Sequence, residues 1–264
     1  MPRDSLGPGP DITLKTWPPA DPVHPVLIVA LDVPTLAEAS ALVERLRPVT
    51  PWFKVGSVLF TAVGPEAVRL VHAAGGRVFL DLKFHDIPRT VAGAVSAAAE
   101  LGVALVTVHC TGGHAMLEAA ATAAARSLGR TRVLGVTRLT SDAGRVGPSV
   151  LRAADAAKAA GLDGVTASAR ECARIKARCG AAFRVLTPGI RPAGSVAGDQ
   201  VRIVTPAQAV RAGSDYLVVG RPILMAPDPA AAAAAIVTEI GAAAAQRPRA
   251  LAMPVGSDIE DRSR

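Results

Sequence analysis

The stretch Asp81-Leu82-Lys83-Phe84-His85-Asp86-Ile87-Pro88-Arg89-Thr90 directly follows an apolar run that predicts a β-strand. It sets a carboxylate, an ammonium and a second carboxylate at positions 81, 83 and 86. Residues two apart in a strand point to the same face, so we expect Asp81 and Lys83 side by side and Leu82 facing the opposite layer. Opposite charges are costly to bury at a strand end unless each is satisfied. The stretch therefore predicts a site of chemistry, and with it an enzyme.

Outward from this stretch, short β-branched runs alternate with longer amphipathic segments, roughly every 25 to 30 residues, as in repeated βα units around a parallel sheet. Helix starts carry capping signals at Thr35-Leu36-Ala37-Glu38, at Thr205-Pro206-Ala207-Gln208 and at Asp228-Pro229. The pattern predicts an α/β fold, a (β/α)8 TIM barrel. The alternative is a doubly wound open sheet, although no G-x-G-x-x-G motif follows the first strand. The predicted strands are Val26–Asp32, Trp52–Val55, Arg77–Lys83, Ala104–His109, Arg132–Thr137, Gly164–Ala167, Arg184–Thr187 and Asp215–Gly220.

The chain of 264 residues, half of them hydrophobic, is long enough for one large domain. We expect a single catalytic barrel at residues 23–246. The segment 1–22 is rich in Pro, Gly and Asp, and the segment 247–264 is dominated by Pro and charged residues. Such compositions predict a flexible N-terminal extension and a flexible C-terminal tail.

Charge and composition narrow the range of partners. The formal net charge of +7 favours anionic ligands such as phosphates. Aromatic residues make up only 3% and no Lys/Arg runs cluster, which argues against nucleic-acid binding. Three cysteines without C-x-x-C spacing predict neither a disulfide framework nor a zinc site and fit a cytoplasmic protein. Without a signal-peptide pattern or a membrane-spanning run, we expect no membrane association.

Polar residues follow the predicted strands where a barrel has its active site. Asp32 ends the first strand, Lys54 lies near the end of the second, and Asp81 and Lys83 end the third. Because the carboxyl ends of all strands surround one mouth, these four side chains are expected to alternate in charge around it. The fifth strand leads into Thr140-Ser141, which we expect at the same mouth.

The loops after the last two strands predict a phosphate site, as is common in this fold. Glycine allows a backbone N–H to approach an oxyanion closely, and arginine adds a planar fork of donors. The connection 188–205 is long for a barrel loop and is expected to act as a flap. The residues concerned are Arg191, the Gly-rich segment Gly194 to Gly198, Gln200, Gly220 and Arg221. Pro188, at the start of the flap, is expected to bind the substrate.

Taken together and in order, these segments resemble the orotidine 5'-phosphate decarboxylase family over about residues 25 to 245. Any one segment alone would be a weak signal, whereas the ordered combination is specific. The matching segments are Ala30-Leu31-Asp32, Phe53-Lys54-Val55-Gly56, Asp81 to Thr90, Leu139-Thr140-Ser141, Thr187-Pro188-Gly189-Ile190-Arg191-Pro192, Gly198-Asp199-Gln200 and Val219-Gly220-Arg221-Pro222.

The resemblance implies conversion of orotidine 5'-monophosphate (OMP) to uridine 5'-monophosphate (UMP), the last step of de novo pyrimidine biosynthesis, without metal or organic cofactor. It implies that Lys83 is the proton donor to the ring carbon and that Asp81 lies against the substrate carboxylate. Lys54 and Asp32 would bind the ribose hydroxyls. Asp86 and Thr90 would reach the neighbouring subunit's site, which implies a homodimer.

The remaining site residues divide between two parts of the substrate in the same resemblance. Thr140 and Ser141 would contact the pyrimidine. The phosphate would be held by the loops after the last two strands, through Arg191, Gln200, Gly220 and Arg221.

Other interpretations stay open at this point. Asp32 could cap a helix, Lys54 could snorkel at the surface, and Asp81 with Lys83 could form a structural ion pair. A metal-dependent sugar-phosphate decarboxylase or aldolase-like barrel shares the D-x-K-x-x-D run, and a non-catalytic nucleotide binder would also use a basic surface. Arg89 departs from the resemblance, which leads us to expect Asn before Thr90.

Overall fold

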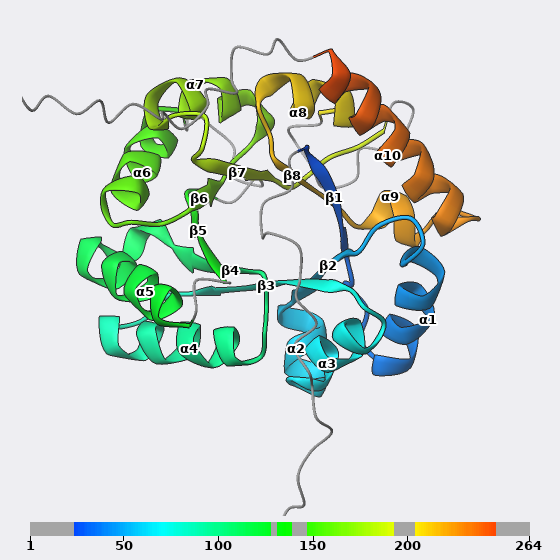
Figure 1. The fold of residues 1–264 in the computed structure, drawn as a ribbon, viewed down its shortest axis with the longest axis horizontal. Coiled ribbons are helices and arrows are strands. Elements are labelled where there is room, and N and C mark those ends of the chain that lie inside the picture. Colours follow the sequence, from blue (N-terminus) through cyan, green and yellow to red (C-terminus); the bar gives the residue numbers. More distant parts are fainter. Residues whose placement is uncertain (1–23, 128–130, 139–146, 193–203, 247–264) are drawn as a thin grey trace, which may run out of the picture.

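The computed structural model of the protein describes residues 24–127, 131–138, 147–192 and 204–246. Within these residues, parallel strands β1 to β8 close into a barrel in chain order, and β8 pairs with β1. Figure 1 shows the strands at the centre with the helices around them. The predicted (β/α)8 barrel is confirmed, and the doubly wound alternative is wrong. The extensions expected at 1–22 and 247–264 lie outside the described residues.

The strands are short and follow the predicted positions, with small differences at their ends. The ladder stops at Ala30 and Val219, before the predicted ends at Asp32 and Gly220, because the chain there turns into the loops of the barrel mouth. The strands are β1 Val26–Ala30, β2 Trp52–Gly56, β3 Arg77–Phe84, β4 Leu105–His109, β5 Arg132–Val136, β6 Gly164–Thr166, β7 Arg184–Thr187 and β8 Tyr216–Val219.

The helices form the outer layer of the barrel (Figure 1). None of the described helices combines the length and apolar character needed to span a bilayer. They are α1 Leu36–Leu46, α2 Ser57–Val63, α3 Glu66–Ala73, α4 Pro88–Glu100, the short 3-10 helix η1 Cys110–Gly112, α5 His114–Arg126, α6 Gly147–Ala159, α7 Ala169–Cys179, α8 Pro206–Ala212, α9 Arg221–Leu224 and α10 Pro229–Ala245.

Side-chain caps begin the helices where the sequence predicts them. Thr205 forms a complete capping box with Gln208, and Asp228 accepts hydrogen bonds from the first backbone N–H groups of α10. At α1 the Thr35 hydroxyl accepts from the N–H of Glu38 at 3.2 Å, so only this half of the predicted box forms. These caps satisfy N–H groups that have no partner inside the helix.

Two apolar clusters hold the barrel together. The larger lies between the strands and the surrounding helices. The second fills the barrel interior, where Trp52 and Tyr216 pack edge to face with ring centroids 5.8 Å apart. Phe79 and Leu105 belong to this inner cluster and are almost fully buried. The interior is therefore a packed core that supports the mouth and leaves no pore.

Strand β3 contains an irregularity next to the candidate site. Its pairing with β4 is regular at Leu80, opposite Val106, and resumes only at Phe84, opposite Val108. Lys83 lies between them with a φ of 52°, the only non-glycine residue of the described chain with positive φ. Such a conformation is uncommon for a residue with a side chain, and the strain it carries is often found at functional sites.

Candidate active site

Four charged side chains meet in an alternating row at the barrel mouth. Lys54 Nζ lies 2.8 Å from Asp32 Oδ1 and 3.9 Å from Asp81 Oδ2, and Lys83 Nζ lies 2.8 Å from the same Asp81 oxygen. The Lys54 and Asp81 side chains are only 12% and 14% exposed, whereas Asp32 is 51% exposed. The Asp81 carboxylate lies between the two ammonium groups, so the row presents alternating charges to a ligand in the mouth.

The position of this row follows from strand alternation. Lys54 comes two residues after Trp52, and Asp81 two residues after Phe79, both of which point into the barrel. Side chains two residues apart in a strand lie on the same face of the sheet. Lys54 and Asp81 therefore also point inward, near the carboxyl ends of their strands. Leu82 packs against the outer cluster, as the sequence predicts.

Thr107 of β4 lies next to the charged row and was not predicted from the sequence. Thr107 is fully buried, and its hydroxyl contacts both Asp81 and the backbone of Lys83. The available signal was its spacing, because Thr107 comes two residues after the inward-facing Leu105. A polar residue on an inward strand position near the mouth should have been a candidate.

The end of the barrel formed by β7 and β8 gathers positive charge. Arg191 is 6% exposed and donates from Nη1 to the carbonyl of Ile190 at 3.1 Å. Burial lowers the pKa of Arg191, and the positive charge of Arg221 lowers it further. Two guanidinium groups close enough to repel each other, beside Gly220 at the start of α9, form a setting in which an anion would be stabilised.

Several predicted residues are placed away from the charged row or lie outside the described part of the chain. Asp86 and Thr90 are exposed at the start of α4, and Asp86 accepts a hydrogen bond from the N–H of Ile87 at 2.6 Å. Pro188 is half-buried directly after β7. Thr140, Ser141 and Gln200, with most of the expected flap, fall outside the described residues.

Two histidines lie beside the row. The rings of His85 and His109 have centroids 5.4 Å apart. Burial lowers the pKa of His109, and the nearby charges of His85 and Lys83 lower it further. Within the described residues, no group of three or more His, Cys, Asp or Glu side chains is arranged to hold a metal ion.

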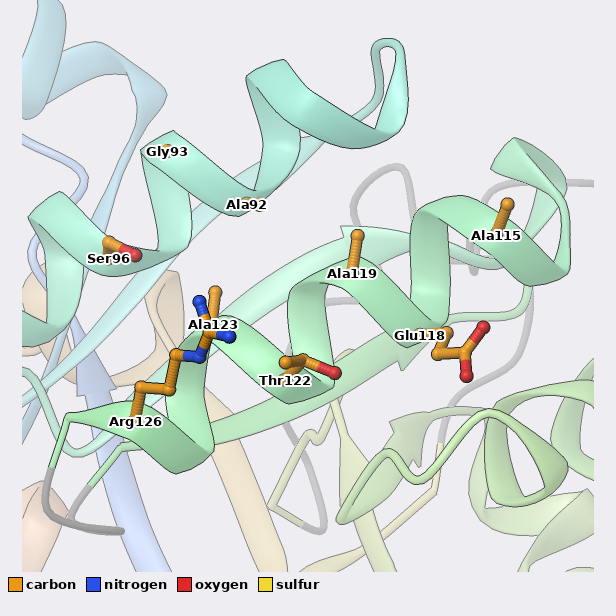
Figure 2. A pocket seen from close by; sticks show the side chains of 9 residues that line it. All are labelled: Ala92, Gly93, Ser96, Ala115, Glu118, Ala119, Thr122, Ala123 and Arg126. Atoms are coloured by element: carbon orange, nitrogen blue, oxygen red, sulfur yellow. The ribbon is translucent and has the colours of Figure 1, made fainter.

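A surface groove between α4 and α5, with a volume of about 470 Å3, is separate from this site (Figure 2). Small side chains from both helices line it, together with Glu118 and Arg126 of α5. None of the candidate site residues contributes to its walls, so it is no part of the charged mouth.

Comparison with known proteins identifies the family. Residues 25–236 match the family described as "Orotidine 5'-phosphate decarboxylase / HUMPS family". The chain belongs to this family. The resemblance inferred from the ordered motifs is thereby confirmed, and the matched segment contains every strand of the barrel.

Individual members of the orotidine 5'-phosphate decarboxylase family are similar over most of their length. The orotidine 5'-phosphate decarboxylase of Halorhodospira halophila is 56% identical over 84% of this chain and 98% of its own. That of Moorella thermoacetica is 54% identical over 81% of this chain and 91% of its own. The crystal structure of the orotidine 5'-phosphate decarboxylase of Lactobacillus acidophilus is 36% identical with a TM-score of 0.72, covering 82% of this chain and 99% of that one.

Arg89, the departure from the pattern that we expect for the orotidine 5'-phosphate decarboxylase family, is exposed in the first turn of α4. It takes no part in the hydrogen bonds and ion pairs of the charged row within its own chain.

Proposed function

We propose that this chain decarboxylates OMP to UMP at the charged row in the barrel mouth, with Lys83 as the proton donor. Membership of the family and similarity to its decarboxylases support the assignment of this reaction. The observation that supports the assignment to residues is the alternation Asp32, Lys54, Asp81, Lys83, with neighbouring charges 2.8 to 3.9 Å apart. The catalytic unit in this proposal is the barrel at residues 23–246, acting in the cytoplasm.

The proposed chemistry uses charge and proton transfer alone. The bond between the pyrimidine ring and the carboxylate breaks, CO2 leaves, and its electron pair stays on the ring carbon. The Lys83 ammonium stabilises this pair electrostatically and then donates a proton to the carbon. Asp81 lies beside the departing carboxylate and holds the Lys83 ammonium at 2.8 Å. Solvent restores the proton to Lys83 after product release.

Fixed charges are suited to a reaction with no electron sink. Such a decarboxylation starts from a very slow reference, so a barrier reduction of roughly 20 kcal/mol or more is needed. No single hydrogen bond supplies this amount. A preorganised row of charges does not have to reorient during the reaction, as water would, and binding energy from a distant phosphate can hold the reacting group against it.

The phosphate is assigned to Arg191, Gln200, Gly220 and Arg221. Support comes from the mutual repulsion of Arg191 and Arg221, which an anion between them would relieve. Lys54 and Asp32 are assigned to the ribose hydroxyls, and Thr140 with Ser141 to the pyrimidine. This order places the phosphate and the reacting carboxylate at opposite ends of one ligand.

The proposed active unit is a homodimer in which Asp86 and Thr90 complete the partner's site. Both residues are exposed, and Ile87 between them is 61% exposed. In its own chain Asp86 bonds to a neighbouring backbone N–H and is outside the charged row. A large exposed apolar side chain between two exposed polar residues makes this turn accessible to a neighbouring subunit.

The test is turnover by the purified protein in the presence of a metal chelator, followed as the loss of absorbance when OMP becomes UMP. We expect full activity with chelator present. Absence of turnover would contradict the assignment. Chelator-sensitive activity on a pentulose phosphate would favour the metal-dependent sugar-phosphate enzyme, and UMP binding without turnover would favour a nucleotide binder.

A further inference from the structure

We infer that Thr107 is a positioning residue for the decarboxylation, holding Lys83 and Asp81 in register through its hydroxyl group. The inference rests on the proposed roles of Lys83 and Asp81. It adds a residue on β4 that the sequence reasoning did not single out and that touches neither end of the ligand in the proposed arrangement.

The pairing of β3 with β4 singles out Thr107. Val106 pairs with Leu80, and Val108 pairs with Phe84. Thr107 is thus the one β4 residue opposite three residues of β3, at positions 81 to 83. Extra residues in one strand interrupt the regular backbone ladder and redirect the side chains that they carry. Here the redirected side chains are the proposed catalytic pair.

The Thr107 hydroxyl supplies hydrogen bonds within this interruption. Its Oγ1 accepts from the backbone N–H of Lys83 at 3.0 Å and donates to Asp81 Oδ1 at 3.0 Å. In a regular parallel pair, a strand N–H donates to a backbone carbonyl of the neighbouring strand. At Lys83 a side-chain oxygen accepts instead, and its single proton is directed to the carboxylate.

These bonds close a ring through both ends of Lys83. The backbone N–H of Lys83 bonds to Thr107, Thr107 bonds to Asp81 Oδ1, and Asp81 Oδ2 accepts from Lys83 Nζ at 2.8 Å. The two oxygens of Asp81 therefore have separate partners, which fixes the rotation of the carboxylate. Since the position of the ammonium depends on both the backbone and the carboxylate, one hydroxyl controls the geometry of the pair.

The backbone of Lys83 explains why such control is needed. With a φ of 52°, Lys83 adopts a left-handed conformation that is strained for a residue with a side chain. A conformation of this kind persists when surrounding contacts over-determine it. Removing the acceptor for the Lys83 N–H would allow the backbone to relax and would move Nζ away from its place beside Asp81.

A purely structural threonine elsewhere in the barrel provides the comparison. Thr50 is also buried, donates to the carbonyl of Leu27 at 2.8 Å and accepts from the N–H of Trp52 at 3.2 Å. It therefore has the same two-bond pattern at the amino end of the strands, away from the charged row. Thr50→Val and Thr107→Val each remove one donated and one accepted hydroxyl bond while keeping the shape of the side chain. A loss of kcat in Thr107→Val alone would therefore come from its position beside the charged row.

The experiment compares kcat, KM for OMP and thermal midpoint in the wild-type enzyme and in three variants. For Thr107→Val we expect a loss of kcat of about 10²-fold, the scale of a misplaced reacting group, with a much smaller change in KM. Thr107→Ser keeps the hydroxyl and should retain kcat within about threefold of wild type. Thr50→Val should lower the thermal midpoint as Thr107→Val does, yet keep wild-type kcat.

Three results would overturn the inference: wild-type kcat in Thr107→Val, equal losses in Thr107→Ser and Thr107→Val, or an equal loss in Thr50→Val. Should Thr107→Val not fold, Thr107→Ala against Thr107→Ser makes the same comparison of hydroxyl absent and present. A wild-type enzyme without turnover would contradict the proposed function itself. Normal wild-type turnover with an active Thr107→Val would contradict only the role of Thr107.

Discussion

The backbone of Gly56 lies so close to Lys54 that a β-carbon added to the glycine would be 2.7 Å from the lysine Nζ. The same β-carbon would be 3.3 Å from Asp32 Oδ1. A side chain at this position would therefore compete with the ammonium for space, whereas the φ of −100° at Gly56 is open to any residue. The absence of a side chain at Gly56 thus leaves room for the contact between Lys54 and Asp32.

Gly56→Ala is therefore expected to damage the site while sparing the fold. The flexible end of Lys54 can move aside, so the barrel should keep its thermal midpoint, but the 2.8 Å contact with Asp32 should be lost. We expect kcat/KM for OMP to fall by about 10- to 100-fold. Gly241→Ala is the matched control, because an added β-carbon there meets nothing within 4 Å. Wild-type activity in Gly56→Ala would remove Lys54 from the proposed site.

Lys83→Ala tests the proton donor. Loss of the ammonium removes both the acid and the charge that stabilises the ring carbanion, so we expect kcat to fall by about 10³-fold or more. UMP should still bind, which isothermal titration can measure. Residual activity within tenfold of wild type would assign the proton transfer to another group.

Arg221→Ala tests the proposed role of Arg221 in binding the phosphate. A charge-assisted hydrogen bond contributes about 1.5–3 kcal/mol, so we expect the affinity for UMP to fall by about 10- to 100-fold. Binding of uridine, which lacks the phosphate, should change little, and the comparison of the two ligands by titration is the decisive measurement. Arg69→Ala removes the same charge from α3, where Arg69 pairs with Glu66, and should leave both affinities unchanged. Equal losses for UMP and uridine would place Arg221 elsewhere in the site.

Mixing two inactive variants tests the shared site. In a dimer of Lys83→Ala with Asp86→Asn, one site carries both changes and the other carries neither if Asp86 serves the partner. Random exchange of subunits should then restore about one quarter of wild-type activity. Mixing that restores nothing, despite exchange demonstrated by mass spectrometry, would mean that Asp86 acts within its own chain.

His72 predicts how stability depends on pH. Burial lowers its pKa by more than hydrogen bonding to the carbonyls of Gly76 and Leu101 raises it. The unfolded chain therefore binds the extra proton as pH falls below about 6.5, and the folded state loses stability over that range. For one proton the slope is at most about 1.4 kcal/mol per pH unit. Denaturant unfolding between pH 7 and 5 should show a smaller slope for His72→Gln than for the wild type or the exposed control His114→Gln.

The sequence alone was sufficient for the barrel and for all four members of the charged row. The alternation of residues in strands, the helix caps and the turn residues are local signals. Each of them affects the conformation of only a few neighbouring residues. Asp81 and Lys83 could be paired from their spacing, and Lys54 could be added once parallel strands were assumed. The roles of the site residues stay predictions, and three of these residues, Thr140, Ser141 and Gln200, lie outside the described part of the chain.

Only the tertiary structure revealed the irregular register of β3 and β4, the positive φ of Lys83 and the hydroxyl of Thr107 between them. Twenty-four positions separate Lys83 from Thr107. The sequence around either residue does not determine which residue of the neighbouring strand lies opposite it. Register depends on how two strands pack against a shared core, which is a property of the closed barrel. The sequence determined which charges enter the mouth, and the barrel decided how they are held.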